Sequence, residues 1–335
     1  MRSIKRTGFW AGALVLAGTM TLGIAGQAIA DDGYGEYRER FEPLPALPPI
    51  PADNSLTAEK IELGKMLFFE PRISSSGVIS CATCHNPALG WADRIPQSVG
   101  HEGQVGDRNT PTVLNSGFLD SQFWDGREPD LEGQALGPIE AEVEMAMDLD
   151  EALERLDGFE EYHKSFGEAF PGDDDPLTAD NVAKALASFQ RTLNTPNSPF
   201  DRYLRGDMQA MTEQQKRGMA AFVDNGCVAC HHGPALTDGG FHRFELPEGP
   251  TDEGRYIVTG EEDDQFRFRT PGLRNVAVTY PYFHNGKVDN LHDAIQLMAE
   301  QMLGSKLEEE TVDDIDAFMH ALTGEMPDVS FPALP

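Results

Sequence analysis

The chain has 335 residues, and its 56 Asp and Glu against 26 Lys and Arg give a formal net charge of −30. Nucleic acids bind to basic surfaces that neutralise phosphates, so this charge argues against a nucleic-acid partner. The charge fits a basic protein partner and fits equally well simple solubility in a high-salt habitat, and composition does not choose between them.

The first thirty residues have the layout of a secretory signal peptide. Three basic residues between positions 2 and 6 precede an apolar run, which ends before the cleavage pattern Ala28-Ile29-Ala30. A retained membrane anchor is the alternative, but the apolar run is short and interrupted by glycines. We expect 1–30 to be removed, leaving a periplasmic chain with no membrane span. Its formal charge is −33, from 23 Lys and Arg against 56 Asp and Glu.

Residues 31–53 are rich in proline and acids and are predicted to form an extended lead-in. Beyond them, apolar residues recur at the spacing of amphipathic helices. These stripes fall at 149–156, 182–193, 212–223, 291–302 and 315–322. Asp148 with Glu151, and Thr212 with Gln215, are predicted capping pairs. Strand-like alternation is scarce apart from 255–258, so the predicted fold class is mainly α.

All four cysteines lie in two C-x-x-C-H motifs, at 81–85 and 227–231. In this motif the two thiols add to the vinyl groups of a haem, and the following His binds the iron. The motifs therefore predict two covalently bound haem c groups rather than disulfides, with a zinc or redox C-x-x-C site as the alternative. The predicted attachment residues are Cys81, Cys84, Cys227 and Cys230, and the predicted proximal iron ligands are His85 and His231.

A weak internal repeat accompanies the two motifs. Gly64-x-x-x-Phe68 precedes the first and Gly218-x-x-x-Phe222 precedes the second. The two motifs also lie about one domain length apart. We therefore expect two cytochrome c-like haem domains packed against each other. Their expected limits are 54–195 and 196–335, with a proline-containing hinge at 194–199.

Longer stretches of the chain add a resemblance to a known family. They are 80–86 (SCATCHN), 106–115 (GDRNTPTVLN), 122–127 (QFWDGR), 134–145 (QALGPIEAEVEM), 270–275 (TPGLRN) and 279–286 (TYPYFHNG). Together they resemble the bacterial dihaem cytochrome c peroxidases, from about Leu56 to Leu322. The resemblance implies reduction of hydrogen peroxide to water, with electrons from a small periplasmic cytochrome c or a cupredoxin.

The resemblance also implies roles around the N-terminal, peroxidatic haem. His101 matches an exchangeable distal ligand of its iron. Glu144 matches the acid that moves protons during O–O cleavage, and Gln134 matches a second distal polar residue. Trp124 matches an electron bridge between the haems. Without the resemblance, His101 would be interpreted as a polar loop residue and Trp124 as a core aromatic. Glu144 and Gln134 would then be two ordinary polar groups.

For the C-terminal, electron-transfer haem, the resemblance makes Met298 the distal iron ligand. Its place on a helical stripe alone is more typical of a core residue. Asn109, Thr279 and Pro281 match an inter-domain Ca²⁺ site, the last two through backbone carbonyls. Trp91 departs from the family pattern, which often has Gly there, and is expected to crowd the edge of the N-terminal haem.

Two other functions remain open at this point. One is the related dihaem oxidase that matures tryptophan tryptophylquinone, in which a Tyr replaces the distal Met; Met298 argues against it. The other is a pure electron carrier, which would need both irons closed by strong ligands. The family is often dimeric, so a homodimer is a possible assembly.

Overall fold

A computed structural model describes Gly8 and residues 32–246 and 252–335. The signal peptide predicted at 1–30 therefore lies outside the described residues, apart from Gly8. From residue 32 onward the described chain belongs to one compact unit, Asp31–Pro335. Within the described residues, no helix combines the length and the apolar character needed to cross a membrane.

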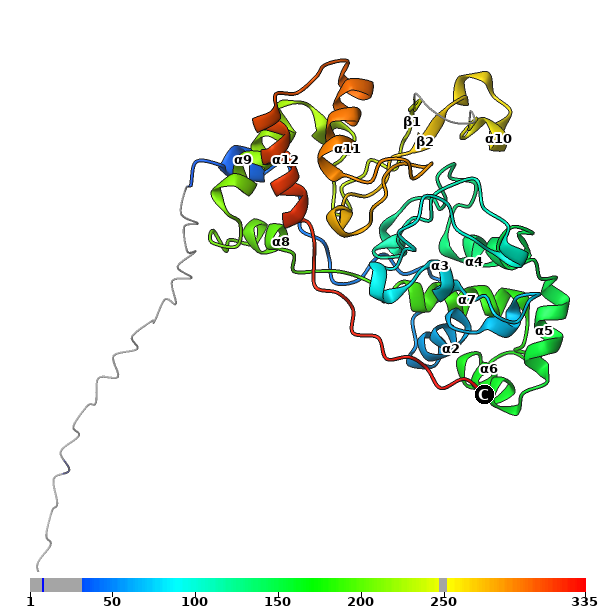
Figure 1. The fold of residues 1–335 in the computed structure, drawn as a ribbon. Helices are drawn as coiled ribbons and strands as arrows, with labels where there is room; N and C mark the ends of the chain where they lie inside the picture. The colour runs from blue at the N-terminus through cyan, green and yellow to red at the C-terminus, as the bar shows by residue number, and fades with distance from the viewer. Residues whose placement is uncertain (1–7, 9–31, 247–251) are drawn as a thin grey trace, which may run out of the picture. The chain divides into compact units, whose positions relative to one another are not determined.

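The fold is mainly α-helical, which confirms the predicted class (Figure 1). One short antiparallel pair of strands is present, β1 (Phe241–Arg243) and β2 (Arg267–Arg269). The strand expected at 255–258 is wrong, because these residues enter helix α10. The helices are α1 (Gly35–Arg38), α2 (Ala58–Phe68), α3 (Cys81–Cys84), α4 (Leu131–Glu140), α5 (Leu149–Asp157), α6 (Glu160–Ala169), α7 (Ala179–Gln190), α8 (Pro199–Leu204), α9 (Glu213–Asp224), α10 (Tyr256–Thr259), α11 (Leu291–Met298) and α12 (Glu309–Ala321).

Both predicted capping pairs can be compared with the observed helix starts. Thr212 and Gln215 form a reciprocal capping box at α9, as predicted. Asp148 caps α5 by accepting from two backbone N–H groups. The Glu151 side chain instead pairs with Arg155 one turn later, so this pair is only half of a capping box.

The predicted repeat is present as two equivalent helix crossings, one in each lobe. Helix α2 packs on α7, and a Cβ on Gly64 would lie 1.9 Å from the Ala185 carbonyl oxygen. Helix α9 packs on α12, and a Cβ on Gly218 would lie 1.8 Å from the Asp314 carbonyl oxygen. Only glycine allows the two backbones of each crossing to approach this closely.

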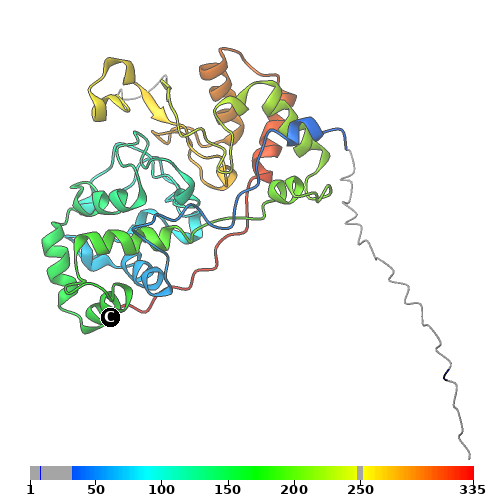
Figure 2. The same cartoon turned by 180° about the vertical axis from the view of Figure 1, so that it is seen from behind.

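Each crossing is the centre of its own hydrophobic core. The first core surrounds Phe68 and Phe189, and the second surrounds Phe222 and Phe318. The rings of each pair meet edge to face, with centroids 5.3 Å and 5.6 Å apart. The chain thus forms two lobes built on one plan, as Figures 1 and 2 show from opposite sides.

The segment predicted as a hinge contains a buried junction between the lobes. Thr195 is fully buried, and its hydroxyl oxygen accepts a hydrogen bond of 2.8 Å from each of two side chains, Asn115 and Asn275. Both asparagines adopt the left-handed conformation, with φ of 61° and 65°. Each asparagine also begins a short 3₁₀ turn, so Asn115 and Asn275 lie at equivalent places in the two lobes.

The two ends of the described chain cross between the lobes. Near the N-terminus, Phe41 belongs to the second hydrophobic core. Near the C-terminus, the ring of Phe331 lies 5.2 Å from that of Phe69 in the first lobe, and Arg72 donates to the Pro335 carbonyl over 3.0 Å. Each lobe is therefore completed by residues from the opposite end of the sequence.

Candidate active site

The first C-x-x-C-H motif opens into a cavity of the first lobe. Cys81, Cys84 and His85 line it together with three polar residues from elsewhere in the chain, Gln134, Glu144 and Gln190. The rest of the lining is largely apolar. Burial raises the pKa of the Cys81 thiol to about 12 and that of Cys84 to about 11, which disfavours the thiolates that zinc or redox chemistry requires. A mostly apolar cavity beside these groups fits a thioether-bound haem.

The two motif histidines are oriented in the same way. The Nδ1 atom of His85 lies 3.4 Å from the Trp91 carbonyl, and that of His231 lies 3.1 Å from the Leu236 carbonyl. Since a carbonyl can only accept, Nδ1 carries the proton and Nε2 is left as the ligand atom. Burial lowers the pKa of both histidines, which favours the neutral form that binds iron.

Trp91 does not crowd the cavity, contrary to the expectation from sequence. Its side chain is buried in the first core, with ring centroids 5.8 Å from Phe68 and 6.2 Å from Phe189. It is not one of the residues that line the cavity. Its φ of 59° explains why glycine would suit this position.

Gln134 and Glu144 reach the cavity from α4 and from the turn that follows it. Pro138 lies in the last turn of α4, and its carbonyl accepts from the Met145 backbone N–H over 3.2 Å. This bond folds the chain back so that Glu144 faces the motif cysteines. Burial raises the pKa of Glu144, and the nearby charge of Arg127 only partly opposes this. The carboxyl group is thus placed to hold or release a proton at higher pH than an exposed Glu.

His101 lies next to this cavity but is not among the residues that line it. Its backbone N–H donates to the Glu144 carbonyl over 2.8 Å. The ring nitrogen Nδ1 is buried and has no hydrogen-bond partner in the described part of the chain. The neighbouring Gly100 is required by space, because a Cβ there would lie 2.0 Å from the Val143 carbonyl oxygen.

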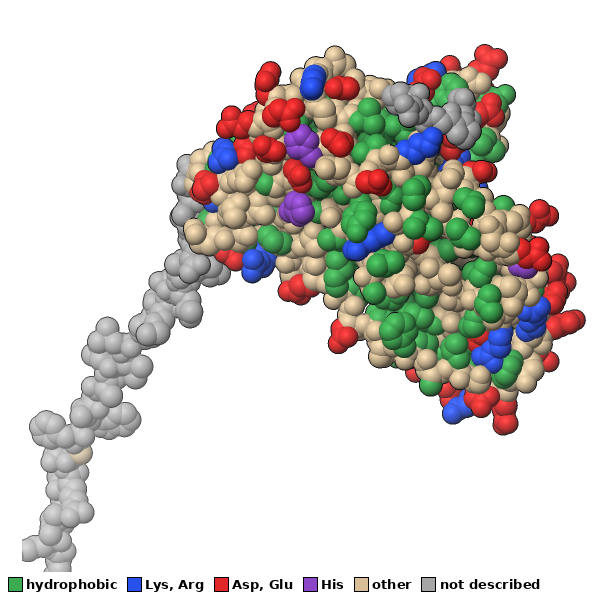
Figure 3. Space-filling model, viewed as in Figure 1, with side chains coloured by type: hydrophobic (Ala, Val, Ile, Leu, Met, Phe, Trp, Pro, Cys, Tyr) green, Lys and Arg blue, Asp and Glu red, His purple; other side chains and the backbone are tan. Residues whose placement is uncertain are grey.

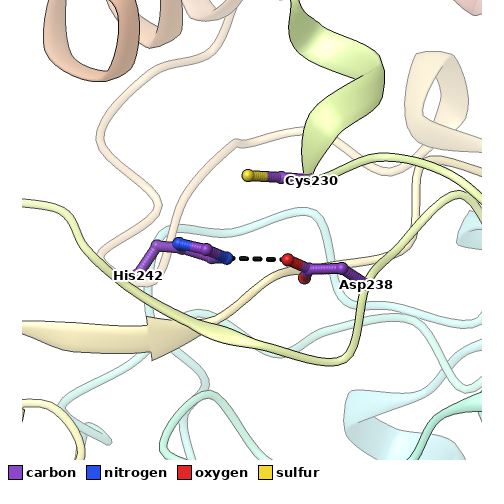
Figure 4. Close-up of side chains that lie close together, drawn as sticks. All are labelled: Cys230, Asp238 and His242. Carbon is purple, nitrogen blue, oxygen red and sulfur yellow. Dashed lines mark hydrogen bonds and ion pairs between the residues drawn. The ribbon is translucent and has the colours of Figure 1, made fainter.

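The second C-x-x-C-H motif has a polar pair beside it that sequence reasoning missed. The ligand atoms of Cys230, Asp238 and His242 all lie within 4.8 Å of one another (Figure 4). His242 Nε2 and Asp238 Oδ2 are 2.8 Å apart, and Asp238 also accepts from the Gly240 N–H. Because Cys230 belongs to a predicted haem-attachment motif, we interpret Asp238 and His242 as a hydrogen-bonded pair next to that motif rather than as ligands of a zinc site.

Met298 stands at the end of α11, where a π-helical turn begins. Its side chain is half-buried and does not belong to the second core, whereas Leu291 and Ile295 of the same helix pack against that core. Met302 is exposed, so the helical stripe expected to reach it ends earlier. Met298 is therefore free of the core packing that its spacing alone suggested.

Trp124 lies at the contact between the lobes. Its ring stands edge to face with that of His284, with centroids 6.3 Å apart, and its Nε1–H donates to the Asn109 carbonyl over 2.9 Å. His284 also stacks on Phe268 at 3.9 Å. Burial lowers the pKa of His284 to about 4, so this imidazole is neutral. Sequence reasoning missed His284, although its offset from Trp124 in the sequence equals that of Asn275 from Asn115.

The residues expected to bind Ca²⁺ lie on loops that meet at the same interface. The Asn109 backbone N–H donates to the His284 carbonyl over 2.7 Å. Arg94 donates to the Val278 carbonyl, one residue before Thr279, over 3.1 Å. The Asn109 amide nitrogen is taken by the Ile95 carbonyl at 2.9 Å, which leaves its oxygen as the atom available to a cation.

Comparisons with known proteins agree with this geometry. The sequence model of the family described as di-haem cytochrome c peroxidase matches residues 58–209. The cytochrome c551 peroxidase of Pseudomonas aeruginosa is 44% identical, over 92% of this chain and 91% of that protein. The methylamine utilization protein MauG of Methylophilus methylotrophus is 38% identical, over 89% of this chain and 92% of that protein. The crystal structure of a MauG-like protein associated with microbial copper homeostasis matches with a TM-score of 0.77 at 28% sequence identity. The match covers 85% of this chain and 94% of that protein.

Proposed function

The chain belongs to the di-haem cytochrome c peroxidases, and on that premise we propose that it reduces hydrogen peroxide to water at its N-terminal haem, with electrons that a small periplasmic cytochrome c or a cupredoxin delivers to its C-terminal haem. The observation that carries this proposal is a single cavity lined by Cys81, Cys84, His85, Gln134 and Glu144. It unites the groups that would hold a haem with the groups that would handle protons.

When bound, the N-terminal haem supplies an iron that takes electrons one at a time and has a position for peroxide. The protein supplies the rest of the chemistry. His85 would hold the iron through Nε2. Gln134 would orient the peroxide, and the Glu144 carboxylate would take a proton from one oxygen and return it to the other. His101 is proposed as the side chain that closes this position when the enzyme rests.

In the C-terminal lobe, His231 and Met298 are proposed as the two iron ligands, a pair that raises the reduction potential. Trp124, at the lobe interface, is proposed as the bridge for electrons. The proposed haem domains are 54–195 and 196–335, each haem being attached through two thioethers. A Ca²⁺ ion on Asn109, Thr279 and Pro281 would tie the domains together, and a homodimer is the proposed assembly.

Two rival functions are separated by particular residues. The enzymatic rival is a quinone-maturing oxidase, and the similarity of the chain to MauG proteins is the observation that supports this rival. The presence of Met298 rather than Tyr favours the peroxidase. A pure electron carrier would have no use for Glu144, a partly buried acid that faces the motif cysteines.

The test uses the haem-loaded protein made with c-type maturation machinery. A reduced small cytochrome c is mixed with the protein, and its oxidation is followed with and without hydrogen peroxide. Peroxide-dependent turnover, together with a mass gain of two haems on the denatured chain, is expected. A protein that carries both haems but oxidises the donor no faster with peroxide would support the carrier instead.

A further inference from the structure

Arg269, the last residue of β2, is a buried cation with no ion-pair partner in the part of the chain that the structure describes. The residue is 5% exposed. Its guanidinium donates only to backbone carbonyls, from Nε to Phe123 and from Nη1 to Thr270, both over 3.2 Å. Carbonyl oxygens satisfy hydrogen bonds but do not balance a full positive charge.

The other two buried arginines among the described residues do have counter-ions. Arg191 pairs with Glu132 at 2.6 Å, and Arg274 pairs with Asp201 at 2.9 Å. A buried charge is strongly unfavourable unless an opposite charge lies close to it. Burial accordingly lowers the pKa of Arg269 to about 10, and the charge of Asp120 opposes this only in part. Arg269 is thus the one buried arginine that has no carboxylate partner among the described residues.

The two-lobe plan identifies the position that Arg269 occupies. The Arg269 backbone N–H donates to the Trp124 carbonyl over 2.8 Å, and the Asn109 backbone N–H donates to the His284 carbonyl over 2.7 Å. Arg269 follows Asn109 in the sequence by the same offset as His284 follows Trp124. The two hydrogen bonds are therefore equivalent contacts across the lobe interface. One lobe carries a proposed calcium ligand at this place, and the other carries an arginine.

Arg269 is also connected to the second C-x-x-C-H motif. The adjoining Thr270 receives a hydrogen bond of 2.7 Å on its carbonyl from the Thr237 hydroxyl, and its backbone N–H donates to the Gly240 carbonyl over 2.9 Å. Asp238, between these two, lies beside Cys230. The end of strand β2 is therefore hydrogen-bonded to the loop that follows the second C-x-x-C-H motif.

We propose that Arg269 binds a propionate of the C-terminal haem and thereby raises the reduction potential of that haem. The inference rests on the proposed function, because it requires haem at the second motif. A haem brings carboxylates that the polypeptide does not contain, and a guanidinium pairs with a carboxylate in a two-pronged geometry. A fixed positive charge near the iron favours the ferrous state, which has one positive charge fewer, so it holds an electron in the accepting haem.

The test is a potentiometric titration of the haem-loaded protein, with the two haems followed separately by their optical spectra and without peroxide. Arg269→Gln should shift the ferric-to-ferrous ratio of the C-terminal haem about tenfold toward ferric at a fixed potential. For one electron this corresponds to a fall of about 59 mV. Arg243→Gln, on the neighbouring strand and paired with exposed Glu245, is the matched control and should leave both potentials unchanged.

Arg269→Lys keeps the charge and provides a second readout if the Gln variant fails to assemble. A lysine paired with the propionate stays protonated, so the potential of the C-terminal haem in this variant should stay close to that of the native protein. Unchanged potentials in Arg269→Gln, a fall of about 59 mV in Arg269→Lys despite its retained charge, or a shift confined to the N-terminal haem would each overturn the proposal.

Glu248 lies outside the described residues, so a separate variant, Glu248→Gln, tests whether its carboxylate is the partner of Arg269. If Glu248→Gln reproduced the shift of Arg269→Gln, the counter-ion would be that carboxylate and the proposal would be wrong. Peroxide turnover is measured independently of these titrations. A failure of the propionate assignment is therefore distinguishable from a failure of the peroxidase assignment, which would show as missing haem or missing turnover.

Discussion

The backbone N–H of His101 donates to the backbone carbonyl of Glu144 over 2.8 Å. The proposed resting-state ligand and the proposed proton carrier are thus joined through their main chains. The contact depends on Gly100, since a Cβ there would lie 2.0 Å from the Val143 carbonyl oxygen. A movement of the His101 loop would therefore also displace the backbone of Glu144, to which it is hydrogen-bonded.

Glu144→Gln should reduce peroxide turnover by about 10²–10⁴-fold, because the amide cannot accept and return a proton. Haem content should not change. The native rate should fall as pH drops through the pKa of Glu144, and since burial raises that pKa, the fall should occur above the usual Glu range. The variant should lack this acidic limb. Glu142→Gln, an exposed acid in the same turn, is the control and should keep the native profile.

His101→Gly should open the N-terminal iron in the fully oxidised protein. The imidazole is proposed to occupy the sixth position at rest, and its loop contains Gly100, Gly103 and Gly106, which lower the barrier to a change of shape. The variant should show high-spin ferric iron and bind cyanide without prior reduction. Native protein should bind cyanide only after one electron is added. Cyanide binding by fully oxidised native protein would contradict this gating but not the peroxidase function.

Met298→His should lower the potential of the C-terminal haem, because imidazole stabilises ferric iron better than a thioether does. The measurement is a redox titration of the haem-loaded variant. Met302→His, at an exposed position one helical turn later, should leave the potential unchanged. Equal potentials in native protein and Met298→His would mean that another side chain binds this iron.

Removal of Ca²⁺ should reduce turnover and loosen any dimer. The proposed site draws on Asn109 from one lobe and on the Thr279 and Pro281 carbonyls from the other, so the ion would hold the interface that contains Trp124. Chelation followed by addition of Ca²⁺ should restore activity, whereas Mg²⁺ should not, since it demands a smaller and more regular set of oxygen ligands. Full activity in metal-free protein would argue against the site.

Turnover with a basic donor cytochrome should fall as salt rises. Acidic side chains are spread over the face shown in Figure 3, and the chain without its first thirty residues carries a formal charge of −33. Screening shortens the attraction between the partners to about 10 Å at 0.1 M salt. Stopped-flow rates at increasing ionic strength measure this effect. Rates that do not change with salt would favour the alternative that the acidity serves solubility.

Much of this protein could be predicted from its sequence because the relevant signals are local. The spacing within 81–85 and 227–231 predicts haem attachment without reference to the fold, since both thiols and the imidazole come from one short run of the chain. Helical stripes predicted α5, α7, α9, α11 and α12 for the same reason, whereas sequence reasoning missed α4 and α6. The Gly64 and Gly218 repeat predicted two similar lobes, and the two helix crossings confirm it. The failure at 255–258 came from a short pattern that helix α10 also satisfies.

The rest was decided by tertiary structure. Glu144 and His85 lie far apart in the sequence, and only the packing of α4 brings both to one cavity. The contact of His284 with Trp124 exists because two lobes of the same plan face each other. The isolation of Arg269 can be recognised only when every neighbour of a buried side chain is known. A local pattern specifies which groups a chain carries, but the free energy of a buried charge depends on groups that arrive from distant parts of the fold.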